Sequence, residues 1–503
     1  MEMSETLATW AEVNYHPYDV IQSINETNST SDKENKLKKF KKNDTWLKVV
    51  TYSYDPKFTF NIKKLPMELD TIRDLKSMGK SEDKIQLTKM FRLLDDLMLR
   101  VVTGNKAKLA CNEFLKQTSR RTGELFYLII KGDLKVGCNK RTFREAYGDG
   151  IVHLPAYMGA VSFKPHLVKA LFNSCYNRPF IENKADGMYG AVVINKTKGL
   201  CYIESRQGEI ILGMNKILKS LYKSNLFQGI DYVLNGEIMI KGVDRAKANG
   251  IVRAIKSLEE KVANGEHSDK KLEKFRSSCG MSLEEAKDKI YMQIWDWLPY
   301  ENYRQGVFIM PRYKRLQKLE EELKGVESME VINYIQAQTY DEAIAFFAQQ
   351  LKDGLEGVIC KSYNGEWKDS RPSYQIKMKI VFTSDLVIKG FVEGQENTRL
   401  EGTLGSLICE TSDGKLRTGV GGFNDHERFE IWSKRDFYLN KIIEVVSNGI
   451  TKAQNADTHA LNYAQAYKIK KKMVIRHDKD EANSLKEVIA IEEAAMYGKC
   501  GKF

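Results

Sequence analysis

The spacing of apolar residues changes character along this chain, and the change limits the folds that it can adopt. Up to about residue 155 the apolar residues recur near the 3.6-residue period of an amphipathic helix, as in residues 84–102. From about residue 157 to 382, short β-branched runs alternate with helical stretches, and β-branched runs dominate after residue 384. A chain of 503 residues is also too long for one ordinary core, so we expect several domains.

The three kinds of pattern predict three domains in a multidomain α+β fold. Residues 1–155 are expected to form a helical domain, residues 156–382 a mixed α/β domain and residues 383–503 a small β-barrel. Residues 246–288 are charged and helical in pattern, and we interpret them as a surface insertion that carries no chemistry. The strands expected in the second domain are residues 190–195, 200–205, 232–240, 289–297 and 357–361, and those expected in the third are residues 386–392, 405–410 and 442–447.

Charge and composition narrow the class of partner and the compartment. The 79 Lys and Arg residues exceed the 67 Asp and Glu residues and leave a net charge of +12, which favours polyanionic partners. The eight cysteines include no C-x-x-C pair, so neither a zinc site nor a disulfide framework is indicated. No apolar run approaches the roughly 18 to 20 residues of a membrane span, and residues 1–15 lack the pattern of a signal peptide. We therefore expect a cytoplasmic protein with no membrane partner.

The most informative stretch is Glu182-Asn-Lys184-Ala-Asp186-Gly187, where a lysine stands at a strand-to-turn position just before the predicted strand 190–195. Lysine's ordinary pKa of about 10.4 leaves only about one molecule in a few thousand uncharged near neutral pH. A lysine nucleophile therefore needs a desolvated pocket with cationic neighbours, for which Lys377, Lys379 and Arg206 are candidates. Taken alone, the K-x-D-G tetrapeptide would be interpreted as a surface turn.

Several acidic, basic and aromatic clusters follow Lys184 in a defined order, each with strand-like flanks. Together with K-x-D-G they resemble the motifs of the ATP-dependent DNA ligases, a family of covalent nucleotidyltransferases, and the likeness is greatest to the ligases of large tailed bacteriophages. The matching clusters are Ser205-Arg206-Gln-Gly208 for S-R-x-G, Asn235-Gly236-Glu237 for D-G-E, Trp295-Asp296 for an aromatic-Asp pair, Glu356-Gly-Val-Ile-Cys-Lys361 for E-G-x-x-x-K, Lys377-Met-Lys379 for K-x-K and Arg476-His-Asp478-Lys479 for R-x-D-K.

The resemblance implies a fold, a reaction and partners. Residues 1–155 would be a DNA-binding domain, residues 156–382 the nucleotidyltransferase (adenylation) domain and residues 383–503 an OB-fold. The reaction would be ATP-dependent sealing of 3′-hydroxyl and 5′-phosphate nicks in duplex DNA through lysyl-AMP and a DNA-adenylate, with ATP and Mg²⁺ or another divalent cation as cofactors. The protein would be a monomer that encircles nicked duplex DNA, in the host cytoplasm if its source is a phage.

The resemblance also assigns a role to each cluster, with Lys184 as the catalytic nucleophile. Glu237 and Glu356 carry the hard oxygens that suit a metal such as Mg²⁺. Trp295 offers a flat face for adenine, and Glu182 offers an acceptor for the adenine amino group. The residues implied to bind ATP or AMP are Glu182, Lys184, Tyr189, Arg206, Glu237, Trp295, Lys377 and Lys379, and those implied to orient pyrophosphate are Arg476, Asp478 and Lys479.

The basic residues are expected to bind phosphate groups, and one basic cluster is expected to move during the reaction. Lys377 and Lys379 would share one strand face and clamp the α-phosphate. Arg206 is also the candidate for gripping the 5′-phosphate of the DNA. The R-x-D-K cluster would close over ATP and then swing away, which requires a flexible joint near residues 383–385.

Two positions depart from the family pattern, and two other readings stay open. Tyr189 stands where the family usually has Arg, and Asn235 stands where it usually has Asp, so we expect rearranged contact near the ribose. An RNA ligase or capping-type nucleotidyltransferase would share several clusters, as would a catalytically impaired DNA-binding homologue. The leading helical domain and the R-x-D-K cluster favour a DNA ligase, and the lack of a four-cysteine zinc module argues against NAD as the cofactor.

Overall fold

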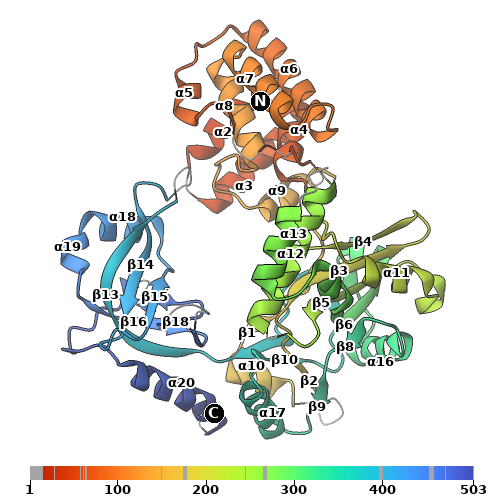
Figure 1. Cartoon of the computed structure of the whole chain (residues 1–503), viewed down its shortest axis with the longest axis vertical. Helices are drawn as coiled ribbons and strands as arrows, with labels where there is room; N and C mark the ends of the chain where they lie inside the picture. The colour runs from red at the N-terminus through yellow and green to blue at the C-terminus, as the bar shows by residue number, and fades with distance from the viewer. Residues whose placement is uncertain are drawn as a thin grey trace, which may run out of the picture.

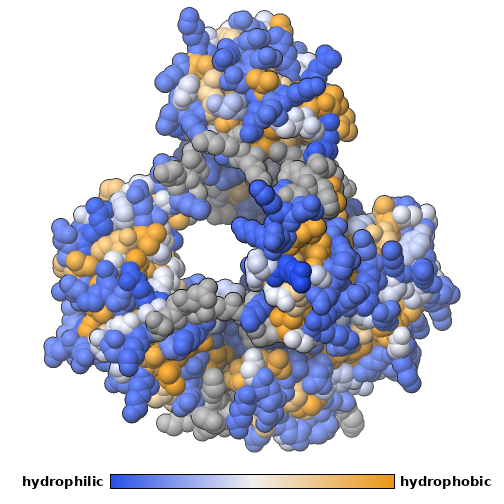
Figure 2. All heavy atoms as spheres, in the orientation of Figure 1, coloured by the Kyte–Doolittle hydropathy of each residue, from blue (hydrophilic) through white to orange (hydrophobic). Residues whose placement is uncertain are grey.

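The chain is described by a computed structural model that covers residues 15–501, except residues 28, 57, 61, 63–64, 149, 174–177, 244, 264–268, 396–399, 453–457 and 471. Three parts surround a central opening, with the helical N-terminal part at the top of the view and the other two parts below it (Figures 1 and 2). None of the helices in these covered ranges has the length and apolar character needed to cross a membrane.

The N-terminal part is helical, as its apolar period predicts. Its helices pack around a core in which Trp46 is fully buried and donates a hydrogen bond from Nε1 to the Tyr147 hydroxyl, at 2.7 Å. The helix predicted from residue 84 begins earlier, at Lys80, and ends at Met98, because the backbone of Arg100, just after the C-cap Leu99, turns to a left-handed φ of 60°. Leu99 is exposed and adds nothing to the apolar face. The helices are α2 (Pro17–Asn25), α3 (Thr30–Lys39), α4 (Asp44–Tyr54), α5 (Leu69–Arg73), α6 (Lys80–Met98), α7 (Gly104–Gln117), α8 (Arg120–Lys131) and α9 (Lys140–Tyr147).

The central part contains two mainly antiparallel five-stranded sheets. The first has the order β1-β12-β10-β2-β9, with β1 at Val161–Ser162, β2 at Phe180–Asn183, β9 at Tyr334–Gln336, β10 at Gly357–Lys361 and β12 at Gln375–Lys379. The second has the order β4-β3-β5-β6-β8, with β3 at Met188–Asn195, β4 at Leu200–Glu204, β5 at Tyr232–Ile240, β6 at Ile290–Pro299 and β8 at Met329–Val331. The five strands predicted here are confirmed as β3, β4, β5, β6 and β10.

Helices pack against these sheets. Three of them contact strands of the second sheet: α11 (Asn215–Lys223), α15 (Tyr300–Gln305) and α16 (Arg312–Leu323). Helix α17 (Tyr340–Lys352) contacts β2 and β10 of the first sheet. The chain passes from β2 of the first sheet to β3 of the second through residues 184–187. The K-x-D-G turn is therefore the direct connection between the two sheets.

Residues 246–288 are helical, as predicted, but the interpretation as a surface insertion was wrong. They form α12 (Arg245–Ala263), α13 (Asp269–Cys279) and α14 (Leu283–Asp288). Helix α12 packs on β5 and buries Val252 and Ile255 completely, so it is part of the central core. Asn249 of the same helix donates a hydrogen bond to the backbone oxygen of Asp186, at 3.3 Å. The sequence pattern of this segment is dominated by charged residues, so the apolar residues that α12 buries were not recognised as part of the core.

The C-terminal part is an antiparallel sheet whose two edges meet. Its strand order is β15-β14-β13-β16-β19. Gly421, just after β15, exchanges backbone hydrogen bonds with Ala464 and Ala466 at the other edge, at 3.1 and 3.0 Å. The predicted strands are confirmed, and the bounds are β13 (Phe382–Glu393), β14 (Leu404–Glu410), β15 (Arg417–Val420), β16 (Ile442–Ser447) and β19 (Gln465–Ala466).

Three helices of this part were not predicted. Two of them, α18 (Asp425–Ser433) and α19 (Arg435–Tyr438), lie between β15 and β16. The third, α20 (Leu485–Gly501), packs against both β13 and α17 and buries Val488 completely. The last helix thus ties the C-terminal sheet to the central part.

Candidate active site

A pocket lies where the two central sheets face each other. Five residues predicted from the sequence line it together: Glu182, Lys184, Arg206, Glu237 and Trp295. The other lining residues are Tyr157, Met158, Ala160, Asn183, Ala185, Ile359, Lys361 and Gln375. The folded chain therefore brings the first four motif clusters to one place.

Lys184 is fixed at the start of the turn that follows β2. Its backbone N–H donates to the oxygen of Gly357 at 2.9 Å, because β2 and β10 pair in a register that sets Asn183 opposite Val358. Its Nζ donates to a carboxylate oxygen of Glu356, and both side chains are only partly exposed. The candidate nucleophile thus has a proton acceptor within hydrogen-bond contact.

The turn from Lys184 to Gly187 is held against β5. The Gly187 N–H donates to the Glu237 carboxylate. A Cβ at Gly187 would lie 2.5 Å from the Ile238 oxygen, so only glycine permits this close approach. The K-x-D-G glycine therefore serves the packing that brings Glu237 beside the nucleophile.

Glu237 is a buried carboxylate with a strongly raised pKa. Burial raises the pKa of Glu237 to about 7 and nearby Glu356 adds to the rise, while the Gly187 N–H, Lys184 and Arg206 oppose it. Glu237 and Glu356 form a pair of neighbouring carboxylates, and a bound cation would stabilise their charged forms. In the described part of the chain no group of three or more His, Cys, Asp and Glu could hold a metal. The pair fits an ion that takes its other ligands from phosphate and water.

Lys377 and Lys379 lie on β12 and point to one face, as their spacing predicts. The β10–β12 register sets Ile359 opposite Lys377 and Gly357 opposite Lys379. Burial lowers the pKa of both lysines, and neighbouring cations, Lys184 among them, lower it further. The mutual influence of these three ammonium groups makes the site favourable for a polyphosphate.

A buried network of charges stands beside the pocket, and the sequence motifs did not indicate it. Arg312 donates to one oxygen of Glu182 at 3.0 Å, and Lys361 Nζ lies 2.6 Å from the other. Arg315 donates to both oxygens of Asp296, at 2.8 and 3.1 Å. Burial lowers the pKa of Lys361 to about 8, and Arg312 adds to this, although Glu182 and Asp296 oppose it. Both oxygens of Glu182 thus have cationic partners, and contact with adenine stays a prediction.

The two positions that depart from the family pattern are in contact with each other. Tyr189 is buried on β3, and its hydroxyl donates to Oδ1 of Asn235 on β5 at 2.7 Å. Its ring centroid lies 6.0 Å from that of Trp295 and 5.0 Å from that of Tyr157. Tyr189 does not line the pocket itself, so in this conformation it supports Trp295 and Tyr157 rather than meeting a ligand directly.

The R-x-D-K cluster lies in the C-terminal part and does not line the pocket. Arg476 donates to both oxygens of the buried Asp385, at 2.9 and 3.0 Å, and Lys479 also binds this carboxylate. Arg476 further pairs with Asp478 at 2.9 Å. Asp385 belongs to β13, at the joint proposed from the sequence, but its part in holding these cations was not foreseen.

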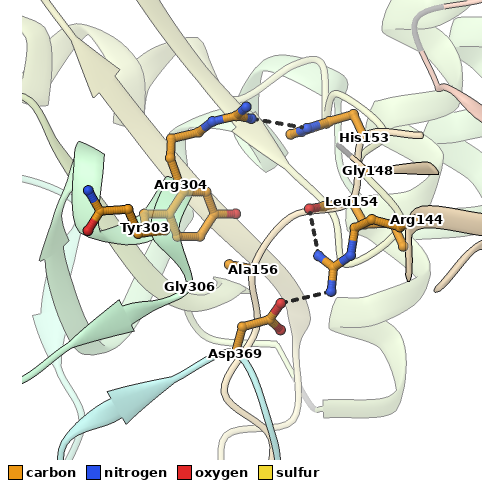
Figure 3. A pocket seen from close by; sticks show the side chains of 10 residues that line it. Arg144, Gly148, His153, Leu154, Ala156, Tyr303, Arg304, Gly306 and Asp369 are labelled. Atoms are coloured by element: carbon orange, nitrogen blue, oxygen red, sulfur yellow. Dashed lines mark hydrogen bonds and ion pairs between the residues drawn. The ribbon is translucent and has the colours of Figure 1, made fainter. Parts of the chain in front are cut away.

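The helical and central parts meet close to the active site. Arg144 of α9 pairs with Asp369 at 2.9 Å, and Arg304 contacts His153 at 3.4 Å, around a second pocket (Figure 3). Asp369 also accepts a hydrogen bond from the backbone N–H of Tyr157, at 3.0 Å. The contact between the two parts therefore reaches a residue that lines the active-site pocket.

Comparison with known proteins agrees with this geometry. Residues 157–379 match the family model described as ATP dependent DNA ligase domain. The DNA ligase of Enterobacteria phage T4 is 23% identical over 493 residues, which cover 93% of this chain and 97% of that protein. The DNA ligase of Enterobacteria phage T6 is 23% identical over 498 residues, with the same two coverages. The solved structure named Pmar-Lig_PreS3 superposes with a TM-score of 0.68 and 18% identity, over 92% of this chain and 100% of that one, which supports a common fold. Residues 157–379 therefore belong to the ATP-dependent DNA ligase domain family, and the chain along most of its length is similar to phage DNA ligases.

Proposed function

We propose that the chain seals nicks between a 3′-hydroxyl and a 5′-phosphate in duplex DNA, by way of AMP carried on Lys184. The observation that carries this proposal is the pocket lined by Lys184 and the buried Glu237, beside which Glu356 contacts Lys184 Nζ. Lys377 and Lys379 do not line this pocket, but their ammonium groups are close enough to interact electrostatically with Lys184. A nucleophile, an acceptor for its proton and cations for phosphate are the groups that nucleotidyl transfer requires.

The first step joins AMP to the protein. The lone pair of Lys184 Nζ attacks the α-phosphorus of ATP, the bond from that phosphorus to the bridging oxygen breaks, and pyrophosphate leaves with the bonding electrons. The amine gives up a proton, for which the Glu356 carboxylate is the hydrogen-bond partner. Lys377 and Lys379 meet the charge that grows on the phosphate oxygens.

Trp295 is proposed to stack on the adenine ring, since it lines the pocket and is supported by Tyr189 behind it. Glu237 and Glu356 are the residues that would hold Mg²⁺. When bound there, Mg²⁺ supplies a positive charge that offsets phosphate and carboxylate repulsion. The steps that follow pass AMP from Lys184 to the 5′-phosphate of the nick, and the 3′-hydroxyl then displaces AMP.

The three parts are proposed to enclose the DNA as a monomer. The central opening is bordered by all of them (Figure 2), and the net charge of +12 favours a polyanion. We propose that the helical part binds DNA and that the C-terminal part is an OB-fold, because its five strands form a sheet with joined edges. The proposed domain bounds are residues 1–155, 156–382 and 383–503, and the proposed location is the cytoplasm of a host cell.

The test of this function is transfer of label from α-labelled ATP to the protein, followed by sealing of a nicked duplex. We expect the labelled protein to lose its label when nicked DNA is added and the strand to become continuous. A protein that acquires no label, or that keeps its label in the presence of a nick, would contradict the proposal. Nicks within RNA, tested alongside, measure how far the substrate extends beyond DNA.

The pKa of Glu237 predicts how the first step depends on pH. Below about pH 7 this carboxyl is protonated and loses its charge for a cation, so the rate of lysine labelling should fall as pH decreases from 8 to 6, with a midpoint near 7. Raising the Mg²⁺ concentration should move the midpoint to lower pH, because the cation favours the carboxylate. Labelling rates measured across this range at two Mg²⁺ concentrations test the prediction.

The raised pKa of Glu237 also predicts that the stability of the protein depends on pH. This dependence tests the pKa independently of the labelling reaction. The folded-state pKa lies above the ordinary 4.5, so the contribution of Glu237 to stability is full below pH 4.5 and is lost as pH rises through 7. Glu237→Gln should therefore stabilise the protein relative to wild type above pH 7 and not below 4.5. A variant whose melting temperature follows that of wild type at every pH would contradict the raised pKa.

The R-x-D-K cluster is proposed to leave Asp385 and orient pyrophosphate during the first step. Asp385→Asn removes the charge that holds Arg476 and Lys479, and hydrogen bonds between charged groups are worth about 1.5 to 3 kcal/mol each. We expect the variant to form lysyl-AMP about tenfold faster, as the cluster is released more readily. Stopped-flow measurement of the labelling rate checks this.

Glu410→Gln is the matched control, because it breaks a partly exposed ion pair with Arg417 on the same sheet. It should leave the labelling rate at the wild-type value. If Asp385→Asn and Glu410→Gln label at the same rate, the hold of Asp385 on the cluster does not limit the first step.

A further inference from the structure

Arg206 stands at the junction of two pockets. It lines the active-site pocket and also a wider cavity, of about 650 Å³, between the helical and central parts. That cavity is lined by more cations than anions, among them Lys140, Arg141 and Arg371. Tyr157 is the other residue that lines both spaces. A group bound in the basic cavity would therefore meet Arg206 before it met Lys184.

The guanidinium of Arg206 rests against two aromatic rings. Its Cζ lies 4.3 Å from the ring centroid of Tyr157 and 5.1 Å from that of Tyr189, and the two rings meet edge to face at 5.0 Å. Within the residues that the structure covers, no hydrogen bond or ion pair of Arg206 is found. Contact with a ring face attracts the cation without using its N–H donors. These donors thus stay available for a phosphate.

Both rings are held in place by other contacts. Tyr189 is buried and bonded to Asn235, as described above. Tyr157 donates its backbone N–H to Asp369, and Asp369 in turn pairs with Arg144 of the helical part (Figure 3). The cradle for Arg206 is therefore connected to the part of the chain that docks beside it.

We propose that Tyr157 and Tyr189 are positioning residues that hold Arg206 for the 5′-phosphate of the nick, so that they serve the transfer of AMP to DNA more than the loading of Lys184. The proposal rests on the proposed function. It follows from the chemistry of the contact, since a carboxylate partner would occupy the guanidinium fork that a phosphate needs, whereas a ring face leaves it open.

The test compares Tyr157→Leu, which removes the ring face, with Tyr157→Phe, which keeps it. Two rates are measured for each protein: labelling by α-labelled ATP, and single-turnover transfer of AMP from the labelled protein to a nicked duplex. We expect Tyr157→Leu to reduce transfer about tenfold more than it reduces labelling, and Tyr157→Phe to recover most of that loss. Labelling by the Leu variant also shows that it is folded.

A double-mutant comparison with Arg206→Ala separates positioning from general damage. If Tyr157 acts through Arg206, then Tyr157→Leu should produce little further loss of transfer in an Arg206→Ala protein. An equal loss in both backgrounds, or equal losses of labelling and transfer, would overturn the proposal. Failure of the wild-type protein to become labelled would instead contradict the proposed function. That result is distinguishable from the two outcomes above, because both of them are measured against a wild-type protein that becomes labelled.

Discussion

Lys184→Ala is expected to abolish both labelling by α-labelled ATP and sealing of a nicked duplex, each by a factor of at least about 10⁴. No other lysine that lines the described pocket both lies in the turn between the two sheets and contacts Glu356. Lys184 begins the tight turn between the two sheets and its Nζ contacts Glu356, while Lys361 is engaged with Glu182 in the buried network. Denaturing electrophoresis of the protein after incubation with labelled ATP measures the first loss, and joining of the DNA strand measures the second.

A pre-adenylated nicked duplex provides the matched control for this variant. The final step uses the DNA-adenylate and not the lysine, so Lys184→Ala should still seal this substrate at a rate far above background. Lys184→Arg keeps the positive charge but supplies no free amine, and it should fail to become labelled as the Ala variant does. Label retained on Lys184→Ala would assign the nucleophile to another lysine, with Lys377, Lys379 and Lys361 the first to be replaced.

The sequence predicted elements best where one residue pattern carries the whole signal. Strands β5 and β10 match their predicted ranges because each is a continuous run rich in branched residues that is buried on both faces. Strands β2 and β9 have only 4 and 3 residues, too few to establish a period. The same limit applies to α19, another element with 4 residues.

The candidate site was predicted where a local motif marks the residues. Five motif residues share one pocket, although Lys184 alone lies in the short turn between β2 and β3. Glu237 and Trp295 are brought together because their strands, β5 and β6, pair side by side. Arg312 and Arg315 could not be identified, because two arginines on a highly charged helix have the pattern of a solvated face. They are buried only because Glu182 and Asp296, distant in the sequence, pack against them. Pairing across such distances is decided by the tertiary fold.

Conformation sets a second limit on what the sequence could predict. The R-x-D-K motif was expected to act at the nucleotide, but here its cations bind Asp385. A sequence motif specifies residue types but not the residues that they contact in a given conformation. A cluster that acts at two stages of a reaction contacts different partners at each stage. The contact between Tyr189 and Asn235 could not be predicted either. The sequence marks each residue separately as a departure from the family pattern, and only the pairing of β3 with β5 brings the two side chains together.

Glu182→Ala is expected to lower the stability of the protein by about 3 to 5 kcal/mol, the range found when one partner is removed from a buried ion pair. Arg312 and Lys361 both point their charges at this carboxylate, and the three side chains are 1%, 6% and 1% exposed for Arg312, Lys361 and Glu182. Removal of Glu182 leaves two buried cations with less compensation. Thermal unfolding followed by calorimetry measures the effect, and Glu145→Ala, which breaks an exposed pair with Arg141, should cost about 0.2 to 1 kcal/mol.

Glu182→Gln then separates the two roles that this residue can have. The amide keeps the shape of the side chain and an oxygen acceptor, but it removes the charge that Arg312 and Lys361 require. If Glu182 mainly holds the buried network, Glu182→Gln should destabilise the protein nearly as much as Glu182→Ala, and its melting temperature should decrease accordingly. If adenine recognition is its main task, the melting temperature should stay at the wild-type value while the KM for ATP increases. The first outcome is the one expected, because both carboxylate oxygens already have cationic partners within 3.0 Å.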